Sequence, residues 1–347
     1  MAKPRIAFIC EDVYFRIHFE KDLDEEYIVQ SFPMRFHQPL SYFAEVVEFN
    51  ADYNIFFRGE FLPDGLLTQL SGININISSE PFPKFVDGRL HATLDSYWRL
   101  DAFLAIQNKG FQYIIHYDAA SASVLRRLGC ELSAYLPFPI AVESLKRDSL
   151  LPKTVPIVNA EFDIFFAGRS SPHRDRLFGP LKHKFNFLHI ESGIFGLELL
   201  PFIKKSKIAI NAHAEDFLSW EPRVQQLLAS GAFVLSEPIC PNQYLLPGVH
   251  FAVADSPDSF LRQCDHYLKA DAQRESIAKA GEERVRSQLA SRSWFRALFE
   301  SISAHRLPPP KFKVDMGMVK ALEHYVRFDE FDFVRSYFAS FNELVDS

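Results

Sequence analysis

Residues 207–237, KIAINAHAEDFLSWEPRVQQLLASGAFVLSE, predict a strand, a polar loop, a helix, a glycine turn and a second strand. Pro222 stands at a first-turn position of the helix, where its missing N–H costs nothing, and Gly231 ends the helix. In α/β sheets, ligands bind beyond the carboxyl ends of the strands, where such loops and helix N-termini gather. The free N–H groups of the helix start, together with Arg223, therefore predict a phosphate site.

The composition is that of a soluble globular protein with room for two domains. The chain has 347 residues, of which 48% are hydrophobic and 24% charged. Its formal net charge of −6 argues against broad binding to nucleic acid, so we expect no nucleic-acid partner. The 35 phenylalanines predict an aromatic-rich core.

Cysteine spacing and the N-terminal sequence predict a cytoplasmic protein. The four cysteines form no CxxC pair, and most of them lie in or beside apolar runs, so buried thiols in a reducing compartment are expected. The first residues, MAKPRIAFICED, lack the apolar segment of a signal peptide and read as a first strand. No stretch approaches the roughly 20 apolar residues of a membrane span.

The first 140 residues predict a domain in which strands alternate with helices. Such alternation is typical of parallel βαβ units with a covered sheet. A mixed, polar segment follows at 141–161 and predicts a linker. The predicted strands are Arg5–Cys10, Tyr53–Phe57, Ile73–Ile77, Tyr113–His116 and Ser133–Leu136, with a short strand at Tyr27–Phe32; the predicted helices are Ser41–Val47, Pro63–Leu70, Asp95–Asn108 and Ala119–Leu128.

The same alternation restarts at residue 162 and predicts a second Rossmann-like domain over 162–310. A helical tail is expected at 311–347, after three consecutive prolines. Its stripe of Phe328, Phe331, Val334, Phe338 and Phe341 most simply packs on the body of its own protein; the alternatives are a homodimer contact and a membrane-surface contact. The predicted strands are Phe162–Ala167, Phe187–Ile190, Lys207–Asn211, Phe233–Ser236 and Phe251–Ala254; the predicted helices begin near His173, Phe195, Pro222, Pro257, Ala272 and Arg292.

The second half resembles group 1 glycosyltransferases of the GT-B fold, in particular the spore-maturation-protein-like branch. The similarity runs from Phe162 to Phe299 and rests on the order and spacing of several motifs, whereas the first half matches only as an architecture. These motifs are the strand DIFFAG with Arg169 and Arg174 after it, KIAIN with Asn211 and His213, the helix from Arg223 to Gly231, AFVLSE, VADSPDSF, the helix around Ile277–Gly281, and Ser293, Trp294 and Arg296.

The resemblance implies two domains facing across a cleft. The C-terminal domain would hold a nucleotide-sugar donor, and the N-terminal domain most of the acceptor, a glycan or glycolipid. It implies no metal and no cofactor, because Arg169, Arg174, Arg223 and a helix N-terminus would bear the diphosphate charge. The further donor-site candidates are Asn211, His213, Glu221, Gln226 and Glu237.

One position departs from the family pattern. Many relatives place a glutamate five residues before the closing glycine of the helix, where it binds the ribose, and here that residue is Gln226. The related pattern of two glutamates eight residues apart also fails, because the earlier position is Leu218, and Glu221 is out of register. The departure keeps open a second hypothesis, a binding protein derived from such an enzyme.

Four residues at strand ends in the first half are candidates for the base that deprotonates the acceptor hydroxyl. A carboxylate or histidine is needed there for inverting transfer. Each also has a structural interpretation, such as capping a turn. The candidates are Asp12, Glu80, His116 and Asp118.

Taken together, the sequence predicts a cytoplasmic glycosyltransferase, at the inner face of the membrane if the tail contacts lipid. A third hypothesis is a sugar-nucleotide epimerase of the same architecture. No Walker loop, GxGxxG or HExxH motif occurs in the chain, so ATPase, dehydrogenase and zinc-protease functions have no local support.

Overall fold

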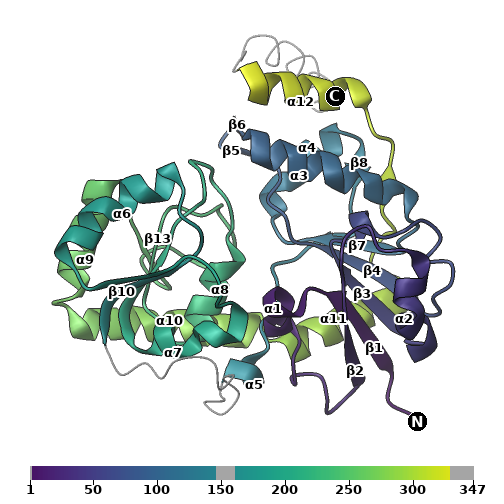
Figure 1. The fold of residues 1–347 in the computed structure, drawn as a ribbon, viewed down its shortest axis with the longest axis horizontal. Helices are drawn as coiled ribbons and strands as arrows, with labels where there is room; N and C mark the ends of the chain where they lie inside the picture. Colours follow the sequence, from purple (N-terminus) through teal and green to yellow (C-terminus); the bar gives the residue numbers. More distant parts are fainter. Residues whose placement is uncertain (1, 146–160, 329–347) are drawn as a thin grey trace. The chain divides into compact units, whose positions relative to one another are not determined.

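The computed structural model describes residues 2–145 and 161–328. It divides into two compact units, each with its own parallel sheet covered by helices, so the predicted α/β class is confirmed (Figure 1). Of the expected linker, residues 146–160 lie outside the described part, and Val142–Leu145 form the short helix α5. Of the described residues, one unit comprises 2–5, 10–33, 137–145 and 161–306, and the other 6–9, 34–136 and 307–328.

The N-terminal sheet has six strands in the order β2-β1-β3-β4-β7-β9. From β1 to β9 neighbouring strands pair in parallel. The inner strands are buried along most of their length, which explains their continuous apolar runs. The strands are β1 (Arg5–Cys10), β2 (Ile28–Pro33), β3 (Tyr53–Phe57), β4 (Ile73–Ser78), β7 (Tyr113–His116) and β9 (Ala134–Tyr135).

Short helices and 3₁₀ turns connect these strands. The helix expected at Pro63–Leu70 is absent: the segment consists of turns, and Gly65 has φ of +81°, which a helix cannot accommodate. The helical segments are α1 (Asp12–Phe15), η1 (Arg16–His18), η2 (Leu40–Phe43), α2 (Ala44–Phe49), η3 (Gly59–Phe61), α3 (Leu94–Leu104), η4 (Ala105–Asn108), η5 (Ala119–Ser121) and α4 (Ala122–Arg127).

Two small antiparallel pairs and a C-terminal helix complete this half. The hairpin of β5 (Lys84–Val86) and β6 (Arg89–His91) was not predicted. The second pair joins β15 (Lys311–Phe312) to β8 (Cys130–Glu131). Helix α12 (Met316–Phe328) then packs against α3 through buried residues such as Met318 and Leu322. Of the predicted tail stripe, Phe328 is exposed, and Phe331, Val334, Phe338 and Phe341 lie outside the described residues.

The C-terminal sheet has five parallel strands in the order β11-β10-β12-β13-β14. Helices α6 and α9 pack together on one side of it, and α8 and α10 pack together on the other (Figure 1). The elements are β10 (Phe162–Ala167), α6 (Pro172–Lys184), β11 (Phe187–Ile190), η7 (Gly196–Leu199), α7 (Leu200–Lys204), β12 (Ser206–Asn211), α8 (Pro222–Ala229), β13 (Val234–Ser236), β14 (Ala252–Val253), α9 (Pro257–Tyr267), α10 (Asp271–Gln288) and α11 (Ser291–Ser303).

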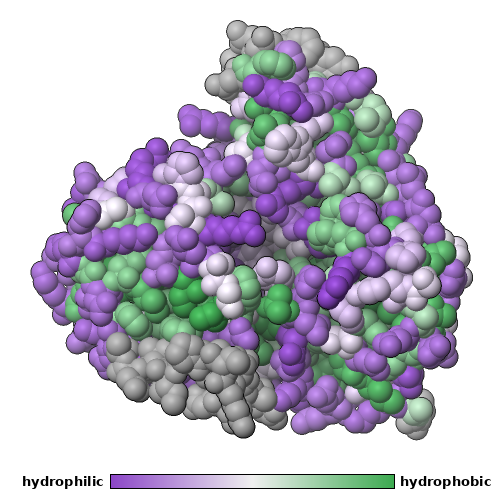
Figure 2. All heavy atoms as spheres, in the orientation of Figure 1, coloured by the Kyte–Doolittle hydropathy of each residue, from purple (hydrophilic) through white to green (hydrophobic). Residues whose placement is uncertain are grey.

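The core of the C-terminal sheet is aromatic, as the composition predicts. Phe166, Phe178 and Phe260 are fully buried there, and the rings of Phe166 and Phe178 lie 4.7 Å apart. All four cysteines are free and buried, in agreement with the sequence analysis. On the face shown in Figure 2, hydrophilic side chains cover much of the surface, with hydrophobic ones between them.

Candidate functional site

Polar side chains converge where three neighbouring strands of the C-terminal sheet end. Strands β10, β12 and β13 are parallel neighbours, so the loops after them meet at one edge of the sheet. Asn211 ends β12 directly opposite Ser236 of β13, and the two side chains share a 2.9 Å hydrogen bond. Helix α8 begins beside them. The strand–loop–helix predicted over 207–237 therefore forms one face of a polar site.

Arg174 fastens two of these loops together. Its Nε and Nη2 atoms donate to the carbonyl of Ala212 at 3.2 and 3.0 Å, and Nη1 donates to the carbonyl of Arg169 at 2.8 Å. The residue is only 5% exposed. Burial and the nearby Arg223 lower the pKa of Arg174 to about 10, so it stays charged at neutral pH. Its N–H groups are engaged by carbonyls, and Arg174 therefore shapes the site more than it contacts a ligand.

Arg223, in the first turn of α8, presents the available cation. Its Nη1 atom donates to Asn211 Oδ1 at 3.3 Å and to the Ala212 carbonyl at 3.2 Å. Within the described residues, no hydrogen bond or ion pair involves its Nε or Nη2 atoms. Its guanidinium lies 5.1 Å from the ring centre of Phe166, which limits its freedom. Arg223 therefore offers two unengaged donor nitrogens beside a helix N-terminus, an arrangement suited to phosphate.

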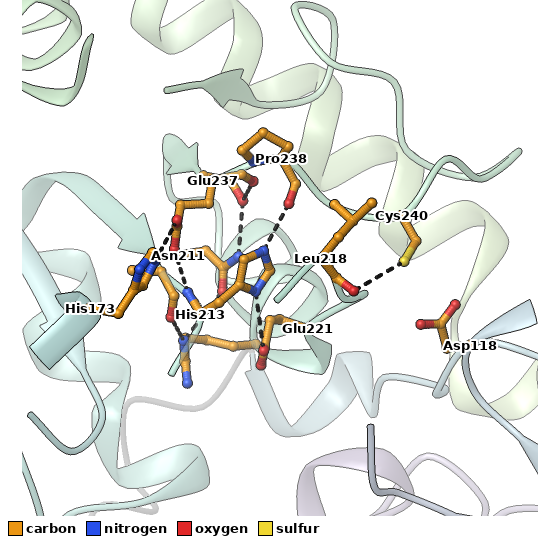
Figure 3. A network of polar contacts seen from close by, with 12 residues as sticks. Asp118, His173, Asn211, His213, Leu218, Glu221, Glu237, Pro238 and Cys240 are labelled. Atoms are coloured by element: carbon orange, nitrogen blue, oxygen red, sulfur yellow. Dashed lines mark hydrogen bonds and ion pairs between the residues drawn. The ribbon is translucent and has the colours of Figure 1, made fainter. Parts of the chain in front are cut away.

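A second group of contacts links two histidines and two carboxylates. Glu237 accepts from His173 Nε2 at 2.8 Å and from the backbone N–H of His213 at 2.6 Å. His213 in turn lies between Glu221 and the carbonyl of Pro238 (Figure 3). Burial tends to raise the pKa of Glu221. The hydrogen bond from His213 and the charge of Arg223 outweigh this effect and lower the pKa to about 2, so this carboxyl is ionised. The network immobilises Glu237, which was expected to contact the donor.

The two adjacent glutamines of α8 are both tied to backbone carbonyls. Gln226 donates to the Gly196 carbonyl of η7 at 2.8 Å. Gln225 is fully buried; it donates to the Phe138 carbonyl at 2.7 Å and accepts from the Trp220 indole at 2.9 Å. In this arrangement the Gln226 amide anchors the loop after β11. A glutamate there would lack the N–H that makes this bond.

Several of these partners were not anticipated. His173 and Phe166 were missed, although His173 follows Pro172 at the start of α6, where a ligand-facing polar residue could have been suspected. Gln225 gave no signal, because a buried amide cannot be recognised from its neighbours in sequence. Arg169, by contrast, is exposed, and its backbone carbonyl accepts from Arg174 Nη1 at 2.8 Å.

Of the candidate bases, Glu80 has both carboxylate oxygens on arginines. Its Oε1 atom accepts from Arg58 at 2.5 Å, and its Oε2 atom pairs with Arg99. Arg58 also pairs with the buried Glu60 at 2.6 Å. Such pairing stabilises the charged carboxylate and weakens it as a proton acceptor.

His116 and Asp118 are buried in the unit that contains β7. Asp118 forms a 2.5 Å ion pair with Lys84, whose side chain is fully buried. His116 stacks on Phe82 with 4.5 Å between ring centres, and burial lowers the pKa of His116 to about 3. His116 is therefore a neutral, enclosed imidazole at physiological pH.

Asp12 has the weakest hydrogen-bond partners of the three carboxylate candidates. It starts α1 and is half-buried; its Oδ2 atom accepts from Ser31 Oγ at 3.2 Å, and its Oδ1 atom lies 3.7 Å from Cys10 Sγ. A carboxylate with only such weak partners keeps lone pairs for an incoming hydroxyl. The catalytic roles of all four residues stay predictions.

The described residues include neither a metal-binding cluster nor a membrane-spanning helix. In residues 2–145 and 161–328, no group of three or more His, Cys, Asp or Glu side chains is arranged to hold a metal ion. Over the same residues, every helix is too short or too polar to span a bilayer.

Sequence comparison supports the interpretation of the second half. A family model described as glycosyl transferase-like matches residues 165–300, close to the range predicted from the motifs. A search of curated proteins finds no match. The spore-maturation-protein-like branch stays a prediction.

Structural comparison confirms the predicted GT-B fold. HepE from Anabaena, in complex with UDP-glucose, is similar with a TM-score of 0.59 and 12% identity over 87% of this chain and 100% of that one. Sucrose-phosphate synthase from Thermosynechococcus elongatus is similar with a TM-score of 0.53 and 12% identity over 87% and 100% of the two chains. A putative UDP-N-acetylglucosamine 2-epimerase from Listeria monocytogenes reaches 0.50 and 10% over 88% and 97%. At these identities the likeness establishes architecture alone.

Proposed function

We propose that this protein is a glycosyltransferase that moves a sugar from a nucleotide donor to a hydroxyl of a glycan or glycolipid. The observation that carries the proposal is the pair of unengaged donor nitrogens, Nε and Nη2, of Arg223 at the start of α8, inside a segment that matches a glycosyl transferase-like family. Among proteins of this fold, HepE was crystallised with UDP-glucose. A UDP-sugar is therefore the first donor to test.

The chemistry follows from where charge develops. As the bond between the sugar's anomeric carbon and the phosphate oxygen of the donor breaks, negative charge accumulates on the departing nucleotide phosphate. Arg223 and the N–H groups of α8 would stabilise that charge in both the bound donor and the transition state. Arg174 holds the Ala212 carbonyl, which in turn fixes Arg223, so it acts as a positioning residue.

For the acceptor we propose Asp12 as the first candidate base and Glu80 as the second. Asp12 has the weaker hydrogen-bond partners, whereas Glu80 would have to leave one arginine to accept a proton. We further propose that transfer needs no metal, because Arg223 and α8 supply the positive charge. Transfer at an unchanged rate in excess EDTA would agree with this, and loss of activity that Mg²⁺ restores would not.

The test begins with binding. Calorimetric titration with UDP-, GDP-, ADP- and dTDP-sugars should identify a donor. Arg223→Met should then raise its Kd by roughly 10–100-fold, because a charge-assisted hydrogen bond contributes about 1.5–3 kcal/mol. Arg262→Met is the matched control, since Arg262 is exposed in the middle of α9 and takes no part in the polar contacts described above. If no nucleotide sugar binds, or if both variants bind equally well, the proposal fails.

A non-catalytic binding protein of the same fold is the second candidate, favoured by the use of the Gln226 amide in anchoring η7. It predicts nucleotide binding with neither transfer nor donor hydrolysis. Turnover that disappears in Arg223→Met would exclude it. Conversion of a UDP-sugar without any acceptor would instead point to an epimerase.

A further inference from the structure

His213 lies between two groups that can only accept hydrogen bonds. Its Nδ1 atom is 3.3 Å from Glu221 Oε1, and its Nε2 atom is 2.8 Å from the carbonyl oxygen of Pro238. A neutral imidazole carries one donor and one acceptor nitrogen, so it can satisfy one of these partners and must repel the other. The side chain is 6% exposed, so water cannot easily take the place of either partner. The geometry therefore requires a proton on both nitrogens.

Four charged residues near His213 come from three elements. Glu221 precedes α8, Glu237 follows β13, Arg174 lies on α6 and Arg223 on α8. The fifth titratable neighbour, His173, accepts from Arg176 at Nδ1 and donates to Glu237 at Nε2. With His213 protonated, three cations face two carboxylates. The hydrogen bond and charge of Glu221, with the charge of Glu237, outweigh burial and raise the pKa of His213 above its ordinary value.

Glu221 is the group whose charge matters for a ligand. It interacts electrostatically with Arg223, whose free N–H donors were assigned above to the donor phosphate. Without a counter-ion of its own, the Glu221 carboxylate would compete with the phosphate for that guanidinium. We propose that His213 is held as an imidazolium that serves as the counter-ion of Glu221 and so leaves Arg223 available to the donor. His213 is thus a positioning residue, and the inference rests on the proposed function.

The first test does not depend on any ligand. A long-range ¹H–¹⁵N spectrum of the full-length protein, assigned with His213→Gln, reports the protonation of the His213 ring directly. We expect both ring nitrogens to be protonated at pH 7. A neutral His213 at that pH would overturn the inference and leave the proposed function untouched.

The second test uses UDP-glucose, whose diphosphate diester does not titrate between pH 6 and 9. We expect the Kd to rise roughly tenfold when His213 loses its proton, and roughly tenfold at pH 6 in His213→Gln. Adding Glu221→Gln to His213→Gln should restore affinity, because it removes the competing carboxylate. A merely structural role of His213 predicts no rescue and so overturns the inference, as does a Kd that stays constant across the pH at which the spectrum shows His213 losing its proton. If UDP-glucose does not bind, the wild type, His213→Gln and the double variant are titrated with the donor found in the calorimetric screen. Failure of every donor refutes the proposed function. The spectrum still decides whether His213 is protonated.

Discussion

Neutralising Asp118 should destabilise the unit that contains β7 by several kcal/mol. Asp118 and Lys84 form a 2.5 Å ion pair, and their side chains are 2% and 0% exposed. The substitution Asp118→Asn keeps the shape of the side chain and the Oδ1 atom that accepts from the Ala120 N–H at 3.0 Å. It removes the charge that compensates the buried Lys84 ammonium and replaces the Oδ2 atom that accepts from Lys84 with an amide N–H donor. Breaking a buried pair from one side costs about 3–5 kcal/mol.

Calorimetry gives a direct measure of this cost. For a unit of this size, each kcal/mol corresponds to about 2–4 °C in Tm, so Asp118→Asn should lower the transition by roughly 6–20 °C. The double replacement Lys84→Met with Asp118→Leu removes both charges and should recover most of that loss, because the desolvation of both groups disappears with them. A loss below about 1 kcal/mol in Asp118→Asn would refute the reasoning.

The same variants separate a structural from a catalytic role. If Asp118 only supports the fold, the double variant should retain transferase activity near that of the wild type. If Asp118 is the acceptor base, activity should fall by several orders of magnitude while stability recovers. Burial tends to raise the pKa of Asp118, but the Lys84 ammonium more than offsets it and the pKa is lowered. The pair should therefore contribute its stability above the unfolded-state pKa of about 3.9 and lose it as pH falls through the lower folded-state value.

Three further predictions concern stability. Gly129 has φ of +78°, and a Cβ there would collide with the Lys313 carbonyl, whereas Gly88 has φ of +73° and open space around it. Gly129→Ala should therefore lower the free energy of unfolding in urea by roughly 2 kcal/mol more than Gly88→Ala, and equal losses would contradict this. Burial lowers the pKa of His18 to about 4, so the unfolded chain takes up the proton first as pH falls from 7.5 to 4.5. Over this range the free energy of unfolding of the wild type should drop by roughly 2–3 kcal/mol more than that of His18→Gln, and parallel pH profiles of the two proteins would refute this prediction. Gln226→Glu should cost roughly 1–3 kcal/mol because a carboxylate cannot donate to the η7 carbonyl, and a variant as stable as the wild type would show that the bond is unimportant.

Most of the architecture was predictable, because local patterns encode it. Continuous apolar runs located the principal parallel strands, and glycine and proline positions located most helix ends. The failures have local causes as well. Pro63–Leu70 carries a helical pattern, but Gly65 adopts a left-handed conformation, and the short β5–β6 hairpin lacks the length that periodicity needs.

The candidate site was predictable in its place more than in its contacts. Asn211, His213, Glu221, Arg223 and Glu237 do gather at one sheet edge, as expected of residues that follow parallel strands. The hydrogen-bond partners of each residue could not be predicted from the sequence. Arg174 and Arg223 carry the same charge in the first turn of a helix, yet carbonyls engage all three nitrogens of Arg174 and only Nη1 of Arg223 has a partner.

The sequence by itself determined the α/β alternation, the phosphate-suited start of α8 and the resemblance of the second half to glycosyltransferases. Each depends on residues near one another in the chain. Only the tertiary structure decided which polar groups meet: Arg58 and Glu80 are 22 residues apart, Lys84 and Asp118 are 34 apart, and His173 and Glu237 are 64 apart. Such pairs are set by strand order and by the depth at which each side chain is buried. Burial also helps to determine whether each group is ionised, because a charged group removed from water depends on its partner for stabilisation.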